Sequence, residues 1–229
     1  MASTYTDLGI ELMVTGENAG TWGDKTNTNL SLIEQLTGGV LSISIAGGAG
    51  NQDLTIPNGA TTGTAQQRVL EFTGTISGAR VIRFPLLTEN FYIIKNGTTG
   101  AHTVQLKAVS GSGATVTFAA GDKGYKIVYL DGVATNTGVF DVFSNTNFGA
   151  ITATGNILPG ANDTYDLGAT GSVWRNIYTG DLHLNNEHKK EGNIVDGSKG
   201  SWTLQEGAED IYLINNKSNE KFRLKLEKI

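Results

Sequence analysis

The chain has 229 residues, which allows one large domain or two small ones. Its formal net charge of −5 argues against a nucleic-acid-binding protein, because phosphate recognition needs clustered Lys and Arg. The lack of Cys excludes a disulfide scaffold, a thiolate zinc site and a cysteine nucleophile, while 31 Gly and only 3 Pro favour short strands joined by tight turns.

No segment of the sequence predicts a membrane anchor or a secretion signal. No apolar run approaches the roughly 18 to 20 residues of a membrane helix. The first residues, MASTYTDLGIEL, show no basic stretch followed by an apolar one. We therefore expect a chain that is made in the cytoplasm and does not insert into a membrane.

The N-terminal region, residues 1–39, carries one helix signal, TWGDKTNTNLSLIEQLTGG. Three residues are candidate N-caps, because their side-chain oxygens can accept hydrogen bonds from free first-turn amides: Asp24, Thr26 and Asn27. Two glycines are expected to end the helix, since glycine takes the left-handed conformation without strain.

The apolar residues of this helix indicate a docking face. Leu30, Ile33 and Leu36 recur every three residues, with Leu32 beside them. Trp22 stands at the expected start of the helix. A helix of about three turns is marginal alone in water, so this face must pack on something.

The middle region, residues 40–147, reads as strands almost throughout. Apolar and polar residues alternate with the period of half-buried strands around Ile43, Leu106 and Phe118. The segment 91–94 is continuously apolar, which predicts a strand covered on both faces. Turn signals such as Asn96-Gly97 separate the strands. We therefore expect an antiparallel β-sandwich or jelly roll.

The third region, residues 148–229, has shorter strands and long polar loops. Its last segment alternates clearly, with Phe222, Leu224 and Leu226 on one face and basic residues on the other. Residues 210–214 precede this segment across a polar turn, which predicts a hairpin. A region of about 80 residues with so little apolar content closes a core poorly alone, so association with further copies is expected.

Three segments of the sequence resemble proteins of tailed phages. TWGDKTNTNLSLIEQLTGGV is similar to the N-terminal region of tail-fibre and related virion proteins, especially those of marine cyanophages. YDLGATGSVWRNIYTGDLHLNNE resembles a fibre motif in which Tyr-Asp-Leu-Gly is followed by Trp and then Ile-Tyr. DGSKGSWTLQEGAEDIYLINNKSNEKFRLKLEKI is similar to the ending of many such fibres.

The resemblance implies a mainly β virion protein that forms intertwined homotrimers, with a small fibre-type β-domain at residues 148–229. It implies attachment to other phage tail or capsid proteins through the N-terminal region, with Trp22, Leu30, Ile33 and Leu36 as candidate contacts. It also implies recognition of a host-surface glycan or protein through unidentified residues. The expected trimer core contains Trp174, Ile177, Tyr178, Phe222, Leu224 and Leu226.

Three functions remain open on these grounds. The expected location is the virion tail fibre, assembled in the host cytoplasm. A purely structural tail adaptor or capsid-attached spike is the main alternative. A glycan-degrading tailspike is the third, because such enzymes use paired carboxylates.

Residues that could carry chemistry are few, and each has a plainer explanation. His183 and His188 are the best metal candidates, but their spacing does not match the two His, one residue apart, of fibres that bind axial metal. Carboxylates cluster at Asp163 and Asp166 and again between residues 206 and 210, beside turns where Asp commonly bonds its own backbone. Trp202 could stack on a sugar, although core packing is the more common role. We therefore expect no enzyme activity, no metal and no cofactor.

Overall fold

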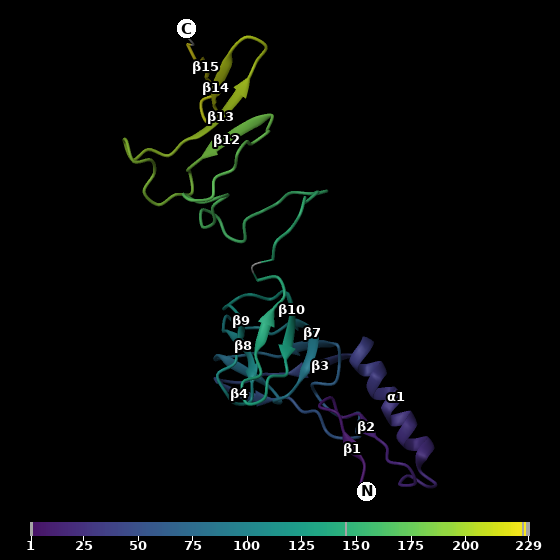
Figure 1. Cartoon of the computed structure of the whole chain (residues 1–229). Coiled ribbons are helices and arrows are strands. Elements are labelled where there is room, and N and C mark those ends of the chain that lie inside the picture. Colours follow the sequence, from purple (N-terminus) through teal and green to yellow (C-terminus); the bar gives the residue numbers. More distant parts are fainter. Residues whose placement is uncertain (1, 145, 226, 228–229) are drawn as a thin grey trace. The chain divides into compact units, whose positions relative to one another are not determined.

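The structure is a computed structural model that describes residues 2–144, 146–225 and 227, and the chain divides into two compact units, Met1–Gly149 and Ala150–Ile229 (Figure 1). Strands are the main regular secondary structure of both units, and the described residues include one helix, α1 (Trp22–Gly38). The predicted mainly β fold with an N-terminal helix is confirmed. Within these described ranges no helix is long and apolar enough to cross a bilayer.

Helix α1 begins earlier than the candidate caps indicated. Its N-cap is Thr21, whose side chain makes no capping hydrogen bond, and Asp24 lies in the first turn, where a carboxylate complements the helix dipole. At the other end Gly39 is extended, with a φ of −69°, so the expected left-handed glycine is wrong. Glycine is needed at position 39 for a steric reason instead, because a Cβ there would collide with the side-chain oxygen of Gln67 and the carbonyl of Gln35.

The short N-terminal strand pair, β1 (Thr4–Tyr5) and β2 (Glu11–Leu12), is fastened to α1 by two side chains one helical turn apart. The Asn29 carboxamide accepts a hydrogen bond from the Glu11 amide and donates one to the Glu11 carbonyl, both at 2.9 Å. The Lys25 Nζ lies 3.0 Å from Oε2 of the nearly buried Glu11 carboxylate. The hydrogen bond from Lys25 therefore holds the pKa of Glu11 below its usual range.

Acid is expected to release the strand pair from α1. Because the pKa of Glu11 is lower in the folded chain than in the unfolded chain, its contribution is complete at neutral pH and is lost as the pH falls through the folded-state pKa. Pepsin cleavage within residues 2–21 should therefore rise as the pH falls from about 5 to 3. Glu11→Gln should be cleaved throughout that range, whereas Glu34→Gln, on the exposed side of α1, should behave as the parent. Equal cleavage of all three proteins would show that this ion pair does not hold the segment.

Two sheets of mixed strand direction form the rest of the first unit. The five-stranded sheet has the order β11-β10-β7-β5-β3, and the four-stranded sheet has the order β4-β6-β8-β9. Strands β3, β5 and β7 run parallel, as do β4, β6 and β8, while β9, β10 and β11 add antiparallel pairings. The bounds are β3 (Val40–Ser44), β4 (Gly50–Asp53), β5 (Val69–Thr73), β6 (Arg80–Phe84), β7 (Glu89–Asn96), β8 (Val104–Ala108), β9 (Val116–Phe118), β10 (Tyr125–Asp131) and β11 (Val139–Asp141).

The path of the chain makes this unit a short β-solenoid. Three successive passes cross from the first sheet to the second, from β3 to β4, from β5 to β6 and from β7 to β8. The corners stack as well, with parallel bridges from Gly47 to Ile76 and from Thr75 to Thr99. The predicted antiparallel sandwich is therefore wrong in strand direction. A period of two identifies the buried side of a strand but is the same for parallel and antiparallel neighbours.

The hydrophobic core lies between the two sheets. The predicted alternations around Ile43 and Leu106 are confirmed, because these side chains are buried. The expectation for residues 91–94 is wrong, since Tyr92 and Ile94 are buried but Phe91 is 48% exposed. The core contains Ile43, Ile45, Leu54, Ala65, Leu70, Phe72, Ile76, Ile82, Phe84, Tyr92, Ile94, Val104, Leu106, Val116, Phe118, Val128, Leu130 and Val139.

The second unit contains one antiparallel sheet whose strands pair in chain order. They are β12 (Asp181–Asn185), β13 (Ser201–Glu206), β14 (Ile211–Asn215) and β15 (Lys221–Arg223). The predicted C-terminal hairpin is confirmed by the pairing of β14 with β15. Leu226, expected on the inner face of the last strand, lies outside the described residues.

Candidate interaction surfaces

One face of the sheet in the second unit carries a row of apolar side chains that crosses all four strands. Cross-strand partners point to the same side of a sheet, and the register places Leu182 opposite Leu204. Leu213 lies opposite Leu204 on the other side, and Phe222 lies opposite Leu213. Apolar residues two positions further along these strands lie on the same face, in the rows beside this one. We call the whole set the apolar face: Leu182, Leu184, Trp202, Leu204, Ile211, Leu213, Phe222 and Leu224.

The apolar face has no cover within its own unit. None of its members is buried, and Leu184 is 51% exposed. The ring of Phe222 lies 5.8 Å from that of Trp202 and still remains 47% exposed. Thr203, on the opposite face, is the one buried residue in the described part of this unit. The sheet needs a second layer to form a core, and the described residues of the unit do not supply it.

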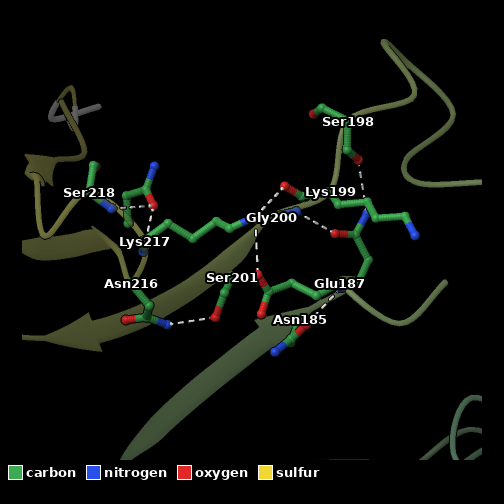
Figure 2. A network of polar contacts seen from close by, with 11 residues as sticks. Asn185, Glu187, Ser198, Lys199, Gly200, Ser201, Asn216, Lys217 and Ser218 are labelled. Atoms are coloured by element: carbon green, nitrogen blue, oxygen red, sulfur yellow. Dashed lines mark hydrogen bonds and ion pairs between the residues drawn. The ribbon is translucent and has the colours of Figure 1, made fainter.

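Polar contacts fix the loops at one end of this sheet (Figure 2). The Lys217 Nζ lies 3.0 Å from Glu187 Oε1 and donates to the Lys199 carbonyl at 3.3 Å. The Asn216 side chain donates to the Ser201 hydroxyl at 3.2 Å. The hydrogen bond from Lys217 holds the pKa of Glu187 below its usual range. The network joins the two ends of the loop between β12 and β13 to the turn between β14 and β15 by hydrogen bonds and an ion pair.

A chain of side-chain hydrogen bonds continues from this network onto the face of the sheet that lies opposite the apolar face. Thr203 Oγ1 donates to Asn216 Oδ1 at 3.1 Å and lies 2.9 Å from His183 Nδ1. These contacts satisfy the hydroxyl of the buried Thr203 and give His183 a hydrogen-bond partner. They favour a role for this face in holding the sheet together.

The segment with the YDLG and Trp motif forms a tight turn. Ala169 and Ser172 exchange two backbone hydrogen bonds of 3.1 and 2.9 Å, and Gly168 has a φ of +93°. A Cβ at position 168 would lie 3.3 Å from Cδ1 of Trp174, so glycine allows this ring to lie close to the turn. The expected members of the trimer core are exposed or half-buried in the single chain: Trp174, Ile177, Tyr178, Phe222 and Leu224.

Helix α1 leaves one apolar stripe exposed. Leu32 and Leu36 are buried, so Leu36 packs within its own chain and is not available to a partner. Trp22, Leu30 and Ile33 are exposed and fall within about 80° of the helix circumference. These three residues remain the candidate attachment contacts.

Chemical groups are sparse on the described surfaces. Among residues 2–144, 146–225 and 227 there is no group of three or more His, Asp or Glu side chains that could hold a metal ion. Asp163 lies 3.6 Å from Lys189, and Asp210 lies 3.4 Å from Arg223, so each carboxylate is paired with a surface cation. Nothing in this arrangement favours a catalytic site over a binding surface.

No protein-family model, no curated protein and no solved structure matches this chain.

Proposed function

We propose that this chain is a structural protein of a phage virion, a homotrimeric tail fibre that attaches through its N-terminal region and helps in recognition of the host surface. The observation that carries the proposal is the uncovered apolar face of the second unit. Copies that bring these faces together would form the core that one chain lacks, because burial of apolar surface is the main driving force of association.

Two further features support this function. The phage-like segments in the sequence imply an assembly of three chains, since the fibres they resemble are trimers. At the other end of the chain, Trp22, Leu30 and Ile33 form an exposed stripe of the kind that marks a protein-binding site. A virion protein with an apolar groove would be its partner.

Native mass spectrometry of the full chain tests the association. A trimer of 24.2 kDa chains is expected at micromolar concentration, and a clean monomer would overturn the proposal. Imaging of the particle that contains the chain then separates a fibre from a tail adaptor or a capsid spike. Release of sugars from a host-surface glycan by the purified chain would instead favour the tailspike alternative.

A further inference from the structure

The first unit has a second uncovered apolar surface, on the side of its five-stranded sheet that points away from the core. Val69 pairs with Ile93, and Ile93 pairs with Ile127, which places one aliphatic row across β5, β7 and β10. In the next row Phe91 pairs with Tyr129. We call this set the outer face: Val40, Val69, Phe91, Ile93, Ile127, Tyr129, Phe140 and Val142.

The outer face is open in the single chain. Val40 is 66% exposed, and no member of the set is buried. The ring of Tyr129 stacks on that of Phe140, with centroids 4.9 Å apart and planes at 14°. One apolar row crosses four strands and the other crosses three, so together they fit the surface of another protein better than a small ligand. Only Tyr129, Phe140 and Val142, at one edge of the set, also line a hollow.

Two basic groups beside the outer face, Lys95 and Arg68, already have partners in the chain. The Lys95 Nζ lies 2.7 Å from Glu71 Oε1, and the Ser42 hydroxyl donates to Glu71 Oε2 at 3.1 Å. The Arg68 guanidinium lies 3.9 Å from the centroid of the Phe91 ring. A second copy could therefore cover these two groups without leaving an unpaired charge, which is the costly case. Glu89, at the end of β7 on the same face, would remain in solvent at the rim of the contact.

The size of the outer face decides which partner it fits. Its eight side chains, each covering about 4.8 Å across the strands and about 6.8 Å along them, present on the order of 300 Å². A stable pair of free proteins needs about 800 Å² from each partner. The outer face is thus too small to hold two free copies together, but it is large enough for copies that are already joined elsewhere.

We propose that the outer faces of several copies of this chain pack against one another once the copies are joined through the apolar face of the second unit. The inference rests on the proposed function, because the second unit supplies the tether. Joining two modules in one assembly raises the effective concentration of the second contact to about the millimolar range. At that concentration a weak apolar contact between identical surfaces forms.

Cysteine cross-linking of the full chain tests this contact, because the natural sequence has no Cys. We would compare Ile127→Cys and Tyr129→Cys with Asn51→Cys, an exposed position on β4 at the far edge of the other sheet. A bifunctional maleimide that spans about 10 Å, the spacing of packed sheets, is the probe. Linked dimers are expected from both outer-face variants, because one Cys per chain lets the reagent join only two chains, and only single chains are expected from Asn51→Cys. Adding Ile93→Asp to Tyr129→Cys should abolish the links and leave the native mass at three chains.

The possible outcomes separate this inference from the proposed function. A trimeric mass, with no more cross-linking from Ile127→Cys and Tyr129→Cys than from Asn51→Cys, overturns the contact and leaves the trimer intact. The same result is expected if another virion protein covers the outer face. A monomeric mass overturns the proposed function and the contact with it.

Discussion

Replacing Leu204 with lysine is expected to abolish association of the chain. Leu204 lies at the centre of the apolar face, between Leu182 on β12 and Leu213 on β14. If copies bury this face, the substitution places a charge among apolar side chains, which costs several kcal/mol. Native mass spectrometry should then show single chains where the parent shows trimers. Far-ultraviolet circular dichroism of the variant would show whether the strands persist.

Gln205→Lys is the matched control, because it introduces the same charge one residue further along β13. The Gln205 side chain points to the opposite face and donates to both carboxylate oxygens of Asp181, at 3.0 and 3.2 Å. A lysine there can replace the hydrogen bond with an ion pair, so the trimer should persist. Equal masses for the two variants would show that the apolar face is not the surface through which copies associate.

Phe84→Ala is expected to destabilise the first unit by about 3–5 kcal/mol. The Phe84 side chain is fully buried between the two sheets, and its ring centroid lies 5.1 Å from that of Tyr92. Its removal leaves a cavity that neighbouring strands cannot close, because parallel pairing on both sides holds β6 in place. Urea denaturation measures the loss, with hydrogen exchange of core peptides used to assign the transition to this unit.

Phe143→Ala removes the same side chain from an exposed position in the same unit. Its effect should stay below about 0.5 kcal/mol. The second unit contains none of this core. As long as the first unit is folded, Phe84→Ala should therefore form assemblies with the same number of chains as the parent. Similar losses for Phe84→Ala and Phe143→Ala would contradict the two-sheet core described above.

The candidate surfaces could be predicted from the sequence only in part. The alternation around Phe222 was plain because charged residues stand between the apolar ones. The same period occurs at Leu182 and Leu184 and at Trp202 and Leu204, but polar loops separate these short segments. Only the register of four strands shows that they share one face.

The exposed stripe of helix α1 could also be predicted from the sequence only in part. A spacing of three and four residues predicts an amphipathic helix but does not say which neighbouring stripe faces the chain. In the folded chain Leu32 and Leu36 are the buried leucines, while Lys25 and Asn29 bind Glu11 of the neighbouring strand pair. Trp22 and Ile33 are left in solvent as a result.

By itself the sequence determined that the chain is mainly β, that a helix precedes the strands of the two-sheet core, and which side chains of several strands are buried. These properties depend on local periodicity, which the residues of a single segment carry. The tertiary structure alone decided that neighbouring strands run parallel, that Phe91 lies outside the core, and that two apolar sheet faces remain open. Strand direction and sheet order depend on contacts between segments far apart in the chain, and the alternation of one strand is the same whichever neighbour it meets.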